Sequence, residues 1–179
     1  SDEFVNYFFD EQKITYAWVF QYMPIGRSYS MDLLVSPNQR QLMLNRQLTQ
    51  LREHGRFLVD FWNGGPISMG CIAGGRSGGY FYVDWDGNIS PCVFFPYGIA
   101  NLHDLYDNGH TISHVLLTDY FRKIREWQDR YTGNRGQGEV GNLFMPCPIR
   151  DHHQFARELI NEHGAKPLDE DAEAALEDT

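Results

Sequence analysis

The stretch YFYVDWDGNISPC at residues 80–92 decides the fold of the second half of this chain. Residues 80–83 and 88–92 have the composition of strands, and Asp84-Trp85-Asp86-Gly87 between them is typical of a tight turn. We therefore predict a β-hairpin whose second strand ends at Cys92.

Glycine and proline are concentrated just before this hairpin, from residue 63 to residue 79, which is typical of a domain boundary. Further upstream, residues 15–23 and 57–61 have the composition of buried strands. Between them we predict a helix that Ser36 caps and Gly55 ends. Strand, helix and strand in this order predict a βα unit of a parallel sheet or barrel. Residues 3–12 have the pattern of a helix end.

Downstream of the hairpin we predict two further helices. One covers about 119–131, and the other is capped by Asp151 and ended by Gly164. Six acidic residues follow between positions 169 and 178. We expect this tail, 165–179, to be disordered.

Composition limits the classes of protein to which the chain can belong. Hydrophobic residues make up 42% and aromatic residues 15% of the sequence, which favours a globular protein over a disordered one. The net charge is −9 and basic residues form no stripe, so we expect no nucleic-acid partner. No apolar run approaches the 18 to 20 or so residues that span a bilayer. We therefore expect a cytoplasmic protein without a membrane span.

The three cysteines Cys71, Cys92 and Cys147 each lie at the end of a predicted element. An odd number does not suit a disulfide framework, and proline precedes two of the three. We expect one shared metal site. Zinc usually takes four close ligands, often from a C-x-x-C pair that this chain lacks, whereas iron–sulfur clusters accept widely spaced thiolates. Asp151, His152, His153 or a substrate could supply a fourth ligand.

These residues resemble a known family. Cys71, the glycine-rich segment, the hairpin ending in Cys92 and then IANLHDL at 99–105 resemble the SPASM or twitch region of radical S-adenosylmethionine (SAM) enzymes. WVFQYMPIGR at 18–27 similarly resembles a late strand of their partial barrel.

The resemblance implies an α/β fold. Residues 1–62 would be the C-terminal fragment of a partial (β/α) barrel, and residues 63–164 a small α+β, twitch-like domain containing the β-hairpin. It also implies an auxiliary [4Fe-4S] cluster on the three cysteines. Gln21, Tyr22 and Met23 would form an edge that faces SAM in the complete enzyme, an oxidoreductase.

The chain departs from the family pattern at three points, of which the missing SAM-cleaving motif limits what it can do alone. The C-x-x-x-C-x-x-C motif that binds the SAM-cleaving cluster is absent, only Cys147 follows Cys92, and Ala100 stands where the family usually has glycine. By resemblance, an N-terminal radical SAM half, in the same polypeptide or as a separate chain, would have to start the radical chemistry. The substrate would be an unknown peptide or small molecule.

A reading from another class stays open. The chain could be a non-catalytic module that binds a protein or peptide and is stabilised by zinc or by no metal at all. Whether the chain is part of an enzyme depends on which of the two readings is right.

Overall fold

Two strands from the first third of the chain pair in parallel with one helix between them in sequence. The computed structural model describes residues 1–61, 64–132 and 140–177. Strands β1 (Tyr16–Val19) and β2 (Phe57–Asp60) align Tyr16 with Phe57, and helix α2 (Pro37–His54) connects them and packs on β2. This confirms the predicted strand–helix–strand unit, although β1 is shorter than expected.

Helix α2 begins and ends where its sequence predicts. The Ser36 hydroxyl accepts a hydrogen bond from the backbone N–H of Gln39, whose side chain accepts one from the backbone N–H of Ser36. Gly55 ends the helix in the left-handed region. The helix does not bury its apolar side chains uniformly, since Leu51 is exposed whereas Gln50 is buried.

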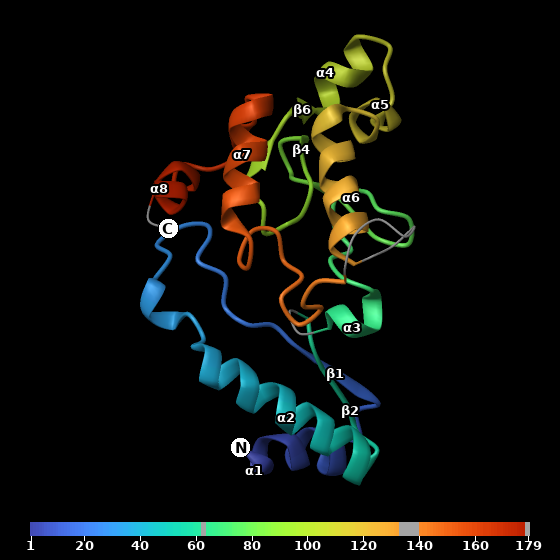
Figure 1. Ribbon diagram of the computed structural model, residues 1–179, viewed down its shortest axis with the longest axis vertical. Helices are drawn as coiled ribbons and strands as arrows, with labels where there is room; N and C mark the ends of the chain where they lie inside the picture. Colours follow the sequence, from blue (N-terminus) through green and yellow to red (C-terminus); the bar gives the residue numbers. More distant parts are fainter. Residues whose placement is uncertain (62–63, 133–139, 178–179) are drawn as a thin grey trace.

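Short helices surround this unit, and Figure 1 shows it at the lower end of the molecule with the N-terminal helix. The helix expected at 3–12 is α1 (Asp2–Asn6), which continues as a π-helix over Tyr7–Glu11. A 3-10 turn lies at Met31–Leu33 and helix α3 at Gly65–Ser68. Within the described residues β1 and β2 pair only with each other. The partial barrel stays a prediction, and its predicted boundary at 62–63 lies outside the described residues.

The predicted hairpin is present, but both strands are shorter than predicted and the second ends at Ser90, two residues before Cys92. Strands β3 (Tyr82–Val83) and β4 (Asn88–Ser90) are antiparallel, and the Asp84 carboxylate accepts hydrogen bonds from two backbone N–H groups of the turn. Strand β6 (Ala100–Asn101) adds to the other edge of β4 and leads into helix α4 (Leu102–Asp107).

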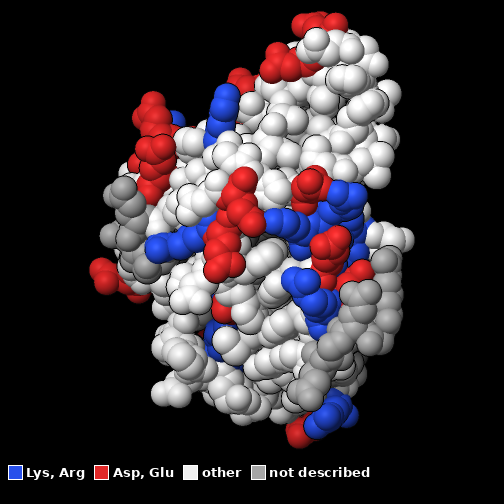
Figure 2. All heavy atoms as spheres, turned by 45° about the horizontal axis from the view of Figure 1, so that its top comes forward, with Lys and Arg blue, Asp and Glu red and all other residues white. Residues whose placement is uncertain are grey.

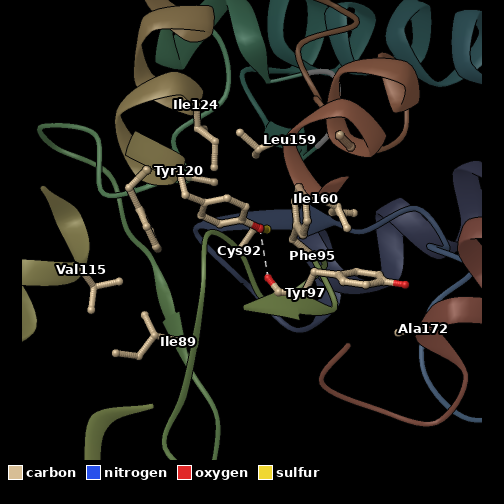
Figure 3. Packing of buried hydrophobic residues seen from close by; sticks show 13 residues of the cluster. Ile89, Cys92, Phe95, Tyr97, Val115, Tyr120, Ile124, Leu159, Ile160 and Ala172 are labelled. Carbon is tan, nitrogen blue, oxygen red and sulfur yellow. Dashed lines mark hydrogen bonds between the residues drawn. The ribbon is translucent and has the colours of Figure 1, made fainter. Parts of the chain in front are cut away.

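Helices α5 (Ile112–Leu116), α6 (Asp119–Tyr131) and α7 (His153–His163) build the main core with this sheet. Figure 3 shows residues of this core: Tyr120 and Ile124 of α6 lie toward Leu159 of α7, and Ile89 of β4 lies toward Val115 of α5. The Tyr120 hydroxyl donates a hydrogen bond to the backbone oxygen of Tyr97 (3.2 Å). Helix α6 has the predicted bounds, and its residues Tyr120, Phe121 and Ile124 are almost completely buried.

The acidic tail differs from the expectation of disorder over residues 165–177. Strand β7 (Lys166–Pro167) pairs with β5 (Tyr97–Gly98), and helix α8 (Ala172–Glu177) follows. Ala172 is 2% exposed because it packs into the main core. Although the tail is rich in charged residues, it makes a short apolar contact with the core, which its composition does not predict.

The surface carries acidic and basic side chains together. On the face drawn in Figure 2, Lys and Arg lie among Asp and Glu across the middle of the molecule. Within the described part of the chain, no helix combines the length and the apolar character needed to cross a membrane.

Alanine substitutions at two glycines test how tightly the loop before the hairpin packs. Gly74 and Gly109 both have a φ of +72°, but a Cβ at Gly74 would lie 2.7 Å from a methyl carbon of Ile124, whereas one at Gly109 would meet nothing within 4 Å. Both alanine variants should lose about 1 kcal/mol of unfolding free energy from backbone strain. Gly74→Ala should lose about 1 to 3 kcal/mol more from overpacking. Urea unfolding measures both, and equal losses would contradict the packing.

Candidate metal centre

The three cysteines come from three separate segments and line the same cavity. Cys71 lies in the glycine-rich loop, Cys92 follows β4, and Cys147 precedes α7. The cavity has a volume of about 150 Å³, comparable to one that accepts a benzene molecule. Most of its wall is apolar, with β2, α3 and α6 contributing side chains around the thiols.

Hydrogen bonds to the hairpin and to α6 hold the loop that carries Cys71. Backbone N–H groups of Gly74 and Tyr80 donate to the carbonyl oxygens of Pro91 and Ile72, each at 2.9 Å. From α6, the buried Gln128 amide donates to the carbonyl oxygen of Ala73 at 2.9 Å. The Cys71 loop and the end of β4 are thus joined three residues after Cys71 and one residue before Cys92.

Each cysteine sulfur receives hydrogen bonds from nearby backbone N–H groups. Phe94 donates to the Cys92 sulfur at 3.4 Å, and Arg150 donates to the Cys147 sulfur at 3.5 Å. The backbone N–H of Ala73 donates a hydrogen bond to the Cys71 sulfur in the same way. Donors of this kind stabilise the thiolate form and orient a sulfur that binds metal.

Burial nevertheless keeps the metal-free thiols protonated. Burial raises the pKa of Cys71 and of Cys92 to about 11, and that of Cys147 to about 12. Neighbouring thiols add to this: Cys92 raises the pKa of Cys71, Cys147 that of Cys92, and Cys71 that of Cys147. The three sulfurs therefore interact electrostatically. A metal that binds them has to displace their protons, so binding is favoured as the pH rises.

The sulfurs are not arranged for a single ion. Within residues 1–61, 64–132 and 140–177, no group of three or more His, Cys, Asp and Glu side chains is placed to hold one metal ion. Tetrahedral zinc with its ligand sulfurs at about 2.3 Å would need those sulfurs about 3.8 Å apart. A cluster is wider, because each cysteine binds a different iron. The three thiols share one cavity, which is what a cluster bound by all three would require.

Asp151 is not directed at the cavity, although its sequence position made it a candidate ligand. Its carboxylate accepts a hydrogen bond from the backbone N–H of Cys147 at 3.1 Å and forms ion pairs with Arg40 at 2.9 Å and Arg150 at 3.2 Å. The side chain is 2% exposed. Nor does Asp151 cap α7 as predicted, since that helix begins at His153 with His152 at its N-cap.

Neither histidine lines the cavity. A ring nitrogen of His152 lies 2.9 Å from the carbonyl oxygen of Met145, and its ring packs edge-on against Trp127 and Tyr131. His153 is exposed and borders a second cavity on the other side of Ile149. None of the three proposed fourth ligands therefore lines the cavity, although the Asp151 carboxylate is close enough to Cys147 to raise the pKa of its thiol.

The predicted SAM-facing residues lie beside the Cys147 segment. Met23 and Cys147 are buried together, and Gln21 is 6% exposed. The Gln21 amide donates to the Asp60 carboxylate at the end of β2, and its oxygen accepts from Arg150 at 3.0 Å. The Tyr22 hydroxyl accepts from the backbone N–H of Ser30 at 2.7 Å. Their role toward SAM stays a prediction.

Arg150 therefore connects the two halves of the chain. Through Gln21 it is linked to Asp60 of β2, and through Asp151 to Arg40 of α2. Arg40 also donates to the carbonyl oxygen of Phe144 at 2.7 Å. This buried polar network, made of Asp60, Gln21, Arg150, Asp151 and Arg40, holds the Cys147 segment against the β1–α2–β2 unit.

Sequence reasoning missed this network and also Tyr80. The Tyr80 hydroxyl lies 2.9 Å from the Cys92 sulfur and borders the cavity. Its place as the first residue of the hairpin stretch, next to the glycine-rich loop, was the available signal. The network carries no such signal, because up to 130 or so residues separate its members in the sequence.

Removing the Asp151 charge tests the network before any metal is bound. Asp151→Asn should lower the unfolding free energy by about 3 kcal/mol, because Arg40 and Arg150 lose a buried anion. The matched variant Asp119→Asn breaks an exposed pair with Arg122 and should cost about 0.5 kcal/mol or less. Urea unfolding of the metal-free protein measures both. If the two variants lose equally little, the buried network does not hold the segment.

Comparisons of the chain with protein families, with curated proteins and with solved structures gave no match. The function therefore has to be argued from the cavity and the residues around it.

Proposed function

We propose that Cys71, Cys92 and Cys147 bind an auxiliary [4Fe-4S] cluster, and that this chain is the C-terminal region of a radical SAM enzyme. The observation that carries the proposal is that three thiols from distant segments line one cavity. The backbone donors to each sulfur support a role as metal-bound thiolates, and the wide sequence spacing without a C-x-x-C pair favours a cluster over zinc.

The chain's own residues would hold such a cluster and keep water from it. An apolar wall surrounds the thiols and includes Pro91, Phe95, Pro146 and Phe155. A bound cluster would supply one-electron chemistry and, with three cysteine ligands, one iron open to another donor atom. The protein's share is to fix three sulfurs and to exclude competing ligands.

One side of the cavity is accessible from outside. Of its lining residues, Trp18 is 53%, Phe57 42% and Ile67 67% exposed. Trp18 and Phe57 belong to the β1–β2 sheet, and Phe20 and Phe61, which directly follow its two strands, stack with ring centroids 5.0 Å apart. A peptide or small-molecule substrate would approach the cluster over these aromatic rings.

The same strands are where the proposed N-terminal half would join. Parallel sheets are almost always covered on both faces and contain more than two strands. Here the two described strands pair only with each other and expose Tyr16 and Trp18. This supports a larger sheet in the complete enzyme. SAM cleavage itself would depend on that half, because the necessary cysteine triplet is absent from this chain.

Anaerobic reconstitution with iron and sulfide tests the proposal. The wild-type protein should bind about four irons per chain and show a broad absorption band at about 400 nm. Cys71→Ala, Cys92→Ala and Cys147→Ala should each lose most of this absorption, because each removes one of three ligands. Ser68→Ala changes the same cavity wall without removing a sulfur and should keep it.

The folded state of each variant is checked first by circular dichroism and urea unfolding. A colourless wild-type protein that binds zinc, or no metal, would overturn the proposal and favour a non-catalytic binding module. A coloured protein whose absorption survives all three cysteine substitutions would overturn the ligand assignment.

A further inference from the structure

Tyr80 stands out among the oxygen-bearing side chains that line the described cavity. Asp60 accepts a hydrogen bond from Gln21, and the Ser68 hydroxyl donates to the carbonyl oxygen of Gly70 at 2.8 Å. The Tyr80 hydroxyl instead contacts a cysteine sulfur, that of Cys92, at 2.9 Å. Tyr80 is also within electrostatic reach of Cys71 and Cys147.

The backbone of Tyr80 fixes the position of this hydroxyl. Its N–H donates to the carbonyl oxygen of Ile72 and its own carbonyl oxygen accepts from Gly75, both at 2.9 Å. Both bonds go to the loop that carries Cys71, while the side chain reaches Cys92. Tyr80 therefore bridges the segments of two proposed ligands, and its ring packs against the main core.

The short distance to Cys92 favours a hydrogen-bond donor over a fourth ligand. In a cubane each iron takes three sulfides and one protein ligand, so a second ligand would belong to a different iron, farther from the Cys92 sulfur. In the metal-free protein either the hydroxyl or the thiol can donate. A metal-bound thiolate has no proton, so the donor must then be Tyr80.

We propose that the Tyr80 hydroxyl donates a hydrogen bond to the Cys92 sulfur of the loaded site and so raises the reduction potential of the cluster. Such a bond withdraws electron density from the sulfur and favours the reduced, more negative cluster. Tyr80 is in this sense a positioning and tuning residue. The inference rests on the proposed cluster site and names a residue that the cysteine pattern does not contain.

Tyr80→Phe tests the inference, because it removes the hydroxyl and keeps the ring. Tyr82→Phe is the matched control: it removes a hydroxyl two residues away on β3, from a side chain that does not line the cavity. Both variants are reconstituted anaerobically beside the wild type, and iron content is measured. Cluster potentials are measured by a spectroscopic redox titration. Resonance Raman spectra in H₂O and D₂O report the hydrogen bond through the iron–cysteine stretching bands.

The expected result is full cluster loading in all three proteins and a more negative potential in Tyr80→Phe alone. The deuterium-sensitive shift of an iron–cysteine band should disappear in the same variant. An unchanged potential in Tyr80→Phe would overturn the tuning role, and failure of that variant to load while Tyr82→Phe loads would overturn it in favour of a ligand or assembly role. An unloaded wild-type protein would instead defeat the proposed function, and this inference with it.

Discussion

The buried carboxylate of Asp151 is the contact on which the candidate site depends. It accepts a hydrogen bond from the backbone of Cys147 and pairs with Arg150 beside it and with Arg40 of α2. Such a charge is costly to bury unless it is paired and hydrogen-bonded, so the segment has one favourable position. That position places the third thiol in the cavity that the other two already line.

The first two thiols are brought together differently. A loop rich in glycine packs against α6, and backbone hydrogen bonds join it to the end of β4. The backbone hydrogen bonds are local to the hairpin region, where Cys71 and Cys92 lie only 21 residues apart, whereas the contact with α6 comes from Gln128, 55 residues after Ala73. The site thus combines a local arrangement that the hairpin dictates with a long-range one that the polar network dictates.

Much of the secondary structure could be predicted because its signals are local. The capping box of Ser36 and Gln39, the turn at Asp84–Gly87 and the apolar face of α6 each depend on residues close in sequence. Two predictions were wrong for the opposite reason. Asp151 has the chemistry of a helix cap, but a more distant arginine competes for it. The tail has the composition of a disordered segment, but Ala172 packs into the main core.

The candidate site, too, could be predicted from the sequence only in part. The positions of the cysteines at element ends predicted a shared site, and all three do line one cavity. No sequence pattern could show that Asp151 and His152 would be used elsewhere, because their partners, Arg40 and the Met145 carbonyl oxygen, are identified only by the fold. The position of Tyr80 beside the glycine-rich loop was only a weak signal, because a tyrosine next to a strand is ordinarily a core residue; its distance to Cys92 is what distinguishes it.

The most direct test of the account is a crystal structure of the anaerobically reconstituted protein with anomalous data collected at the iron edge. The account predicts one compact group of iron peaks inside the cavity, bonded to the sulfurs of Cys71, Cys92 and Cys147. Iron bound elsewhere, or any one of these three sulfurs on a different face of the molecule, would contradict it.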